Sequence, residues 1–257
     1  MNRTVLITGA TSGIGQSCAL QFAKNNFNLI LTGRRLDRLT ALKASLEEQY
    51  HCAVQILCFD VRHLEETKQA IASIDTTRFP VIDILINNAG LASGMSTIDE
   101  GDYDDWNVMI DTNVKGLLHV SREVMPLMKR QGVGHIVNIS STARKDVYAK
   151  GNVYCATKHA VDALSKSMRI DLLPYGIKVT SVNPGACETE FSLVRFKGDE
   201  DRANAVYDGF TPLTPSDVAD AIYYACTLPT HVCILSLIHI SEPTRQAEIS
   251  YAVFCLK

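Results

Sequence analysis

Short runs of β-branched and aliphatic residues alternate along this chain with longer segments of helical period. The runs lie at 5–8, 28–32, 53–59, 82–86, 134–139, 177–182 and 234–240, and the helical segments at 13–25, 36–49, 64–74, 106–131, 153–173 and 215–227. This alternation predicts βαβ units, whose parallel strands are covered by helices on both faces. No linker or repeat interrupts it, so we expect one doubly wound α/β domain with a seven-stranded parallel sheet, a Rossmann fold.

One segment, 186–213, breaks the alternation with a long polar stretch of mixed charge after the sixth predicted strand. Loops of that length in compact domains are usually lids or binding segments. Thr214 follows as the predicted N-cap of the last helix, with Pro215 in its first turn. We therefore expect a lid over a site, and a helix beginning at 215.

The composition argues against several classes of protein. The 25 Lys and Arg residues against 28 Asp and Glu give a net charge of −3, so no basic excess indicates a nucleic-acid or membrane partner. No run reaches the roughly 18 apolar residues that a membrane span needs, and we expect no signal peptide. The eight cysteines show neither Cys-x-x-Cys pairs nor a metal-ligand spacing, which favours free thiols, no metal and a cytoplasmic protein.

The first predicted strand runs into a glycine-rich turn that contains Gly9, Gly13 and Gly15. Glycines let the backbone approach a pyrophosphate closely, and the N-terminus of the following helix offers free N–H groups. A tight turn alone would also use glycines, but the passage from strand to helix favours a nucleotide site.

The second predicted strand ends in Thr32-Gly33-Arg34-Arg35. A site selective for NAD would carry an acidic residue there to hold the ribose 2′-hydroxyl. Guanidinium groups instead suit a 2′-phosphate, so Arg34 and Arg35 favour NADP. The alternative is that one or both arginines simply begin a solvated helix, since Asp37 and Arg38 follow.

Tyr154 and Lys158 lie at the start of a predicted helix, and a spacing of four residues puts them on one face. A nearby ammonium group favours tyrosinate, so we expect Lys158 to lower the pKa of Tyr154 from about 10. Ser140 and Ser141 end the fifth predicted strand, and Ser141 precedes Tyr154 by thirteen residues. Hydroxyls at that end of a strand face the ligand crevice of a doubly wound fold.

Taken together, these residues resemble the short-chain dehydrogenase/reductase family. Its motifs occur in order and at the family's spacing between about residues 4 and 234: Thr8-Gly9-x3-Gly13-Ile14-Gly15, Asn87-Asn88-Ala89-Gly90, Asn113, Ser141, Tyr154-x3-Lys158 and Pro184-Gly185-x3-Thr189. Within the family the chain looks like the NADP-dependent serine and 3-hydroxy acid dehydrogenases, through 32–35, Asp60-Val61-Arg62, Asp111-Thr112-Asn113 and 190–199.

The resemblance implies hydride transfer between NADP(H) and the hydroxyl or carbonyl group of a small 3-hydroxy acid of the serine, allo-threonine or 3-hydroxyisobutyrate type. It implies that Tyr154 is the acid/base, Ser141 polarises the substrate oxygen, Lys158 holds the cofactor ribose and Asn113 completes a proton relay. The cofactor would contact Gly9, Thr11, Ser12, Gly13, Ile14, Gly15, Arg34, Arg35, Asp60, Val61, Asn87, Ala89, Gly90, Tyr154, Lys158, Pro184, Gly185 and Thr189.

Several alternatives remain open beside these implied roles. Asn87 and Asn88 can be a polar strand end, Thr189 a helix cap, and Ser140 the inward hydroxyl. The family implies a homotetramer paired through 106–131 and 153–173. A reductase of other carbonyls, or a non-catalytic NADP-binding sensor, would have the same fold.

Two arginines are expected to lie near the substrate. Arg195, in the 186–213 segment, is expected to hold a substrate carboxylate through its two-pronged guanidinium group. The alternative is a surface ion pair with Asp199 or Glu200. Arg144 stands three residues after Ser141, where the family usually has a small residue, so we expect it to border the substrate cleft.

The segment 235–257 resembles a translated DNA sequencing adapter, so we expect the enzyme domain to be 1–234 and the tail to be foreign to the gene. The apolar run 234–240 can still occupy the edge position of the sheet. Pro243 should end that strand, and the residues after it should be poorly ordered.

Overall fold

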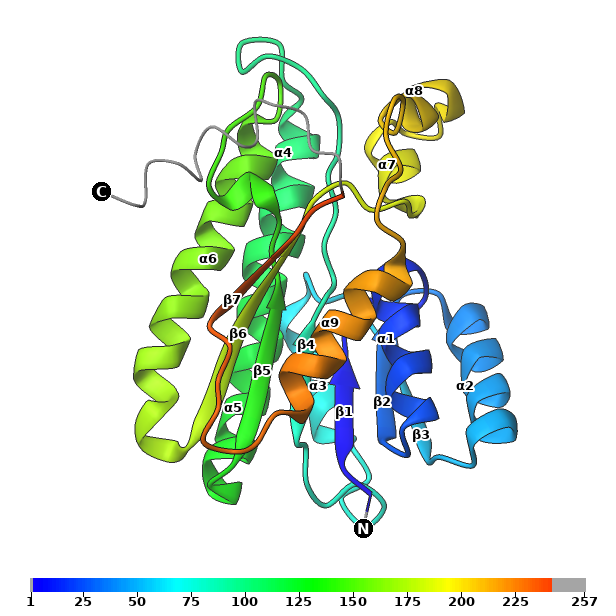
Figure 1. The fold of residues 1–257 in the computed structure, drawn as a ribbon, viewed down its shortest axis with the longest axis vertical. Helices are drawn as coiled ribbons and strands as arrows, with labels where there is room; N and C mark the ends of the chain where they lie inside the picture. Colours follow the sequence, from blue (N-terminus) through cyan, green and yellow to red (C-terminus); the bar gives the residue numbers. More distant parts are fainter. Residues whose placement is uncertain (1, 242–257) are drawn as a thin grey trace.

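Seven short strands form one sheet, in which every neighbouring pair of strands is parallel (Figure 1). The computed structural model describes residues 2–241. The strand order is β3-β2-β1-β4-β5-β6-β7. The strands are β1 (Thr4–Ile7), β2 (Asn28–Gly33), β3 (Val54–Cys58), β4 (Ile84–Asn87), β5 (Gly134–Ile139), β6 (Ile177–Pro184) and β7 (Ser236–His239). The doubly wound, seven-stranded prediction is confirmed, and the order reverses between β1 and β4, where such folds bind ligands.

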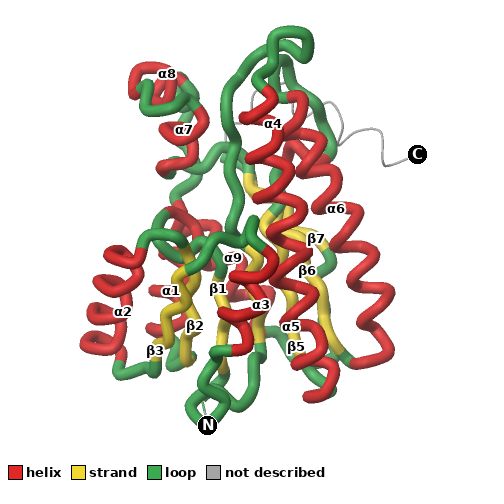
Figure 2. Tube along the Cα trace, turned by 180° about the vertical axis from the view of Figure 1, so that it is seen from behind, coloured by secondary structure: helices red, strands yellow, loops and turns green. Residues whose placement is uncertain are grey.

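Helices cover both faces of the sheet (Figures 1 and 2). One face carries α1 (Gly13–Lys24), α2 (Leu36–Tyr50) and α9 (Pro215–Thr227), and the other carries α3 (Leu64–Ala72), α5 (Leu117–Gln131) and α6 (Asn152–Leu172). Along β1, Val5 and Ile7 pack into the first core and Leu6 into the second. Because both faces are buried, the strands read as continuous apolar runs rather than as an alternation with polar residues.

The helix predicted over 106–131 consists of three parts. α4 (Tyr103–Ile110) leads into a π-helical segment at Asp111–Gly116, and α5 follows. The widened segment contains Asn113, whose side chain bonds both the N–H and the C=O of Leu91. Such widened turns occur often at functional sites, and the apolar periodicity of the sequence does not reveal them.

The polar segment 186–213, called the lid from here on, contains two short helices, α7 (Glu190–Arg195) and α8 (Glu200–Ala205). Figure 1 shows them beyond the ends of the strands, away from the N-terminus. Thr189 caps α7 by accepting a hydrogen bond from the N–H of Phe191, so its predicted role as a helix cap is real. Thr214 caps α9 as predicted, in a reciprocal pair with Asp217.

β7 lies at the edge of the sheet beside β6, with Ser236 opposite Ser181 and His239 opposite Pro184. The apolar run 234–240 thus supplies the seventh strand. Pro243 and the rest of the tail lie outside the described residues. Within 2–241, no helix combines the length and apolar character of a membrane span.

Candidate active site

A cleft of about 480 Å³ lies where the strands end, between the sheet and the lid. This volume falls in the range of small-molecule sites, about 300–1,000 Å³. The segments that follow β1, β2, β3, β4, β5 and β6 all contribute to its walls. The cleft therefore occupies the position at which doubly wound folds bind nucleotides.

The glycine-rich turn is held too tightly for side chains. Gly9 and Gly13 have φ angles of +66° and +53°. A Cβ atom at Gly15 would lie 2.3 Å from the carbonyl oxygen of Gly9, so Gly15 keeps the turn closed although it does not line the cleft. Gly9 and Gly13 do line it, together with Thr11, Ser12 and Ile14. The turn thus leaves the N-terminus of α1 open to the cleft, as a pyrophosphate requires.

Asn88 braces this turn, a role that the sequence did not reveal. Its amide donates hydrogen bonds to the carbonyl oxygens of Thr8, at 2.9 Å, and Gly9, at 3.1 Å. Ala89 and Gly90 line the cleft beside it. Asn87 does not line the cleft, because its amide is buried and donates hydrogen bonds to Ser121 and Asn138.

Arg34 and Arg35 both reach the cleft. Nη1 of Arg34 lies 3.6 Å from a carboxylate oxygen of Asp60, and the Arg34 side chain is 58% exposed. Burial acts to raise the pKa of Asp60, but hydrogen bonds from Arg62 outweigh it and lower the pKa. Asp60 and Val61 also line the cleft, as the resemblance implied.

Arg35 is held against the glycine-rich turn. Its guanidinium group donates to the hydroxyl oxygens of Thr11 and Ser12, at 2.8 and 2.9 Å, and to Glu190 of the lid. Neither arginine is a purely solvated helix start, because each contacts a wall of the cleft.

Ser141, Tyr154 and Lys158 all line the cleft. Ser141 hydrogen-bonds to Tyr154. Lys158 Nζ donates to the carbonyl oxygen of Ile139 at 3.0 Å and lies 5.8 Å from the centre of the Tyr154 ring. The hydroxyl of Ser140 is turned to the backbone of α6, where it donates to the carbonyl oxygen of Lys158.

The pKa of Tyr154 differs from the sequence-based expectation. Burial raises it above its usual value, and the hydrogen bond to Ser141 only opposes this effect. Burial also lowers the pKa of Lys158 to about 8. The prediction that Lys158 lowers the pKa of Tyr154 is therefore wrong for this arrangement, because desolvation dominates both groups.

Asn113 lies behind the cleft wall, not on its surface. Besides its two bonds to Leu91, it donates to the hydroxyl of Thr157 at 3.0 Å. A Cβ atom at Gly90 would lie 3.2 Å from Asn113 Oδ1 and 3.6 Å from Lys158 Nζ, so Gly90 packs closely against both side chains.

Arg195 enters the cleft from the lid. Its guanidinium carbon lies 5.3 Å from the ring centre of Tyr148 and 5.8 Å from that of Tyr154. Its Nε is buried and has no hydrogen-bond partner among the described residues. The alternative ion pair with Asp199 or Glu200 is not formed within residues 2–241.

Arg144 turns away from the cleft, contrary to the prediction. It pairs with Asp162 of α6 and donates to the hydroxyl of Ser236 in β7 at 3.0 Å. The short 3₁₀ turn at Thr142–Arg144 places Thr142 and Ala143 on the cleft wall instead. A cation buried this way needs a charged partner, which Asp162 supplies.

Sequence reasoning missed other residues of the cleft wall. Tyr148 and Phe191 both line it, and the Phe191 ring packs edge-on against Tyr154 at 5.6 Å between centres. Pro184, Gly185 and Thr189 lie there as expected.

The cleft fits the dinucleotide that the sequence predicts. The backbone at Gly13 and Ile14 would hold the pyrophosphate, and Arg34 and Arg35 the 2′-phosphate. Asp60 and Val61 would flank the adenine, and Tyr154 and Lys158 would meet the nicotinamide half. These residues line one continuous cleft. Side chains in place of the glycines would fill the space at its glycine-rich turn.

Known proteins share this architecture. The short chain dehydrogenase family matches residues 3–199. The chain is 42% identical to the serine 3-dehydrogenase of Agrobacterium fabrum over 238 residues, which cover 92% of this chain and 93% of that protein. It is 45% identical to the NADP-dependent 3-hydroxy acid dehydrogenase of Salmonella typhi over 231 residues, 90% of this chain and 91% of that protein. The closed form of a serine dehydrogenase complexed with NADP⁺ matches with a TM-score of 0.89 and 41% identity, covering 95% of this chain and 97% of that chain. The predicted resemblance is thereby confirmed: the chain belongs to the short-chain dehydrogenase family.

Proposed function

We propose that this protein catalyses the reversible, NADP-linked oxidation of the hydroxyl group of a small 3-hydroxy acid, of the serine, allo-threonine or 3-hydroxyisobutyrate type. As a short-chain dehydrogenase it is an oxidoreductase that acts on CH–OH groups with NADP as its cofactor. The finer assignment, to an acid substrate, rests on Arg195. Its guanidinium carbon lies 5.8 Å from the ring centre of Tyr154, near which the reacting hydroxyl would sit, and its buried Nε has no hydrogen-bond partner within residues 2–241.

Arg195 would recognise the carboxylate of such a substrate. A carboxylate would accept hydrogen bonds from the Arg195 guanidinium group, and charge-assisted pairs of this kind fix orientation as well as affinity. Tyr148, which hydrogen-bonds to Arg195, would keep the guanidinium group in place. Both relatives described above act, by their names, on hydroxy acids, which supports the same substrate class here.

In the oxidation direction, NADP when bound supplies the acceptor for the hydride that leaves the substrate carbon. The oxygen of Tyr154 would take up the proton of the substrate hydroxyl as its own phenolic proton leaves, and Ser141 would hydrogen-bond the same oxygen of the substrate. Because burial raises the pKa of Tyr154, the phenol holds its proton firmly and suits the reverse step, donation to a carbonyl. Lys158, which is neutral above its pKa of about 8, would receive the phenolic proton, and Asn113 would complete the relay through water.

The test is a turnover screen with NADP and NAD. Each 3-hydroxy acid is paired with an alcohol that lacks the carboxylate: serine with ethanolamine, and 3-hydroxyisobutyrate with isobutanol. NADPH formation should be faster for the acid of each pair. Equal or faster turnover of the partners without a carboxylate would refute the acid assignment, and absence of turnover with every acid and alcohol would refute the proposed reaction.

We also propose that the active form is a cytoplasmic homotetramer that acts on a small-molecule substrate and binds neither nucleic acid nor membrane. Large apolar side chains are exposed on the helices that would pair, at Ile110, Leu118 and Ile170, and on the 3₁₀ turn that follows α6, at Leu173 and Tyr175. Exposed apolar surface of this kind marks an interaction face. Light scattering measures the mass directly, and a monomer at assay concentration would refute the proposal.

A further inference from the structure

The first turn of the lid crosses the cofactor end of the cleft. Thr189 packs over the glycine-rich turn, where its Cγ2 would lie 3.1 Å from a Cβ atom at Gly13. Glu190 follows as the first residue of α7 and also lines the cleft. The lid therefore meets the two segments that would bind the phosphates.

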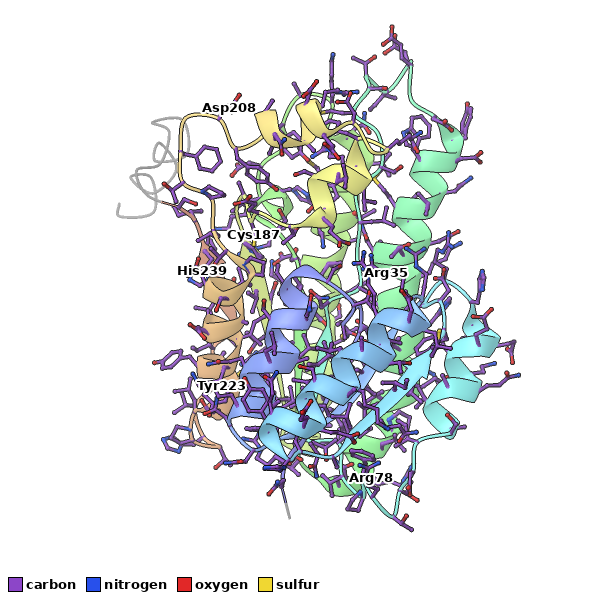
Figure 3. All side chains as sticks on the ribbon, turned by 90° about the vertical axis from the view of Figure 1, so that its right-hand side faces the viewer. Arg35, Arg78, Cys187, Asp208, Tyr223 and His239 are labelled. Carbon is purple, nitrogen blue, oxygen red and sulfur yellow. The ribbon has the colours of Figure 1, made fainter. Side chains whose placement is uncertain are left out.

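The Glu190 carboxylate is engaged by two arginines. Oε2 accepts from Arg35 Nη1 at 2.8 Å, and Oε1 accepts from Arg38 Nη1 at 2.6 Å. These hydrogen bonds, first from Arg35 and then from Arg38, lower the pKa of Glu190. Figure 3 shows Arg35 at the end of α2 nearest the lid. A single carboxylate thus ties the lid to α2 and, through Arg35, to Thr11 and Ser12 of the glycine-rich turn.

We propose that Glu190 is a specificity-determining residue that competes with the 2′-phosphate of the cofactor for Arg35. This inference rests on the proposed function, because it takes Arg34 and Arg35 as the phosphate site. A phosphate dianion carries more charge than a carboxylate and offers three acceptor oxygens, so it draws Arg35 away from Glu190. A ligand with only a 2′-hydroxyl group does not, and the ion pair then stays closed.

The charges around the site agree with such competition. Four guanidinium groups and two carboxylates are joined here by ion pairs: Arg34, Arg35, Arg38 and Arg62 with Asp60 and Glu190. The excess is positive, as a bound phosphate needs, and Glu190 reduces it. Because the Glu190 side chain is 41% exposed, solvent screens its effect, which should be modest and sensitive to salt.

The experiment compares two ligands that differ only in the 2′-phosphate, adenosine 2′,5′-bisphosphate and adenosine 5′-monophosphate. Their dissociation constants are measured by titration calorimetry at low salt on the full chain, so the readout is binding and not turnover. The variant is Glu190→Gln, which keeps the shape of the side chain. The control is Glu200→Gln, which makes the same charge change at an exposed position of α8.

For Glu190→Gln we expect binding of the bisphosphate to tighten by about three- to ten-fold, while binding of the monophosphate changes by less than about two-fold. Glu200→Gln should leave the ratio of the two constants unchanged. High salt should reduce the gain.

Three results would overturn the inference. Equal tightening for both ligands would mean that Glu190 only narrows the cleft, and weaker bisphosphate binding would mean that it orients Arg35. An equal gain in Glu200→Gln would mean that only net charge matters. If the wild-type protein does not prefer the bisphosphate at all, the proposed arginine site itself fails, which separates that failure from the others.

Discussion

Arg195→Met tests how the substrate is recognised. Methionine retains an unbranched apolar stem that can pack against the rings of Tyr148, Tyr154 and Phe196, which the arginine now contacts, but removes the charge and all donors. A hydrogen bond to a charged group contributes about 1.5–3 kcal/mol. Loss of the carboxylate contact should therefore lower kcat/KM for a 3-hydroxy acid by about 10- to 150-fold.

The same substitution can also disturb the lid, because the carbonyl oxygen of Arg195 accepts a hydrogen bond from the N–H of Gly94 at 2.9 Å. The assay therefore measures kcat/KM for an acid and for its uncharged counterpart in both proteins. Recognition of the carboxylate predicts a loss for the acid and little change for the alcohol. Arg195→Lys should recover part of the loss, since it restores the charge but not the planar fork. An equal loss for both substrates would show that Arg195 only stabilises the lid, and would refute the reasoning.

Three further predictions concern the cofactor, a buried charge and the tail. Arg34→Ala should lower kcat/KM with NADP by about 10- to 100-fold and change that with NAD little, since a charged hydrogen bond is lost; an unchanged preference would move the phosphate contact to Arg35. Lys158→Met should raise the free energy of unfolding at pH 7 by about 2–3 kcal/mol. Burial lowers the pKa of the wild-type lysine from 10.5 to about 8, so folding of the wild-type protein at pH 7 carries the cost of burying its charge. The wild-type protein gains stability as the pH rises from about 8 to 10.5, because the lysine then loses its charge in the unfolded state as well. Denaturant melts should therefore show that the difference in unfolding free energy between variant and wild type shrinks over this pH range, and a constant difference would contradict the prediction. Finally, we propose that residues 235–257 derive from a sequencing adapter, so sequencing of the source locus should show a reading frame that ends differently. An uninterrupted genomic frame that encodes this tail would refute the proposal.

The fold was largely predictable because both faces of the sheet are buried. β1 at Thr4–Ile7 is buried along its whole length, so it appears in the sequence as an apolar run. The predicted ends differ from the observed ones by a residue or two, as for 53–59 against Val54–Cys58. The π-helical segment at Asp111–Gly116 was not predictable, since one widened turn inside a long helix leaves no distinct pattern in the sequence. The lid helices were missed because each is only six residues long and depends on its cap.

The site was predictable where one local motif carries the chemistry, as at Tyr154 and Lys158. It was not predictable where distant segments meet. Glu190 and Arg35 are 155 residues apart, and nothing near either in the sequence indicates their ion pair. The prediction that Arg144 borders the cleft was wrong for a related reason. The direction of a side chain on a short 3₁₀ turn depends on its partners, which here are Asp162 and Ser236.

The most direct test of the proposed reaction is the rate of Tyr154→Phe with a 3-hydroxy acid and NADP. The substitution removes one oxygen from a buried ring and should leave the cleft and the binding of NADP intact. Loss of the proton acceptor should lower kcat by about 10²–10⁴-fold, while the dissociation constant for NADPH, measured by fluorescence, stays near the wild-type value. A wild-type rate in this variant would contradict the account, because another group would then have to carry the proton.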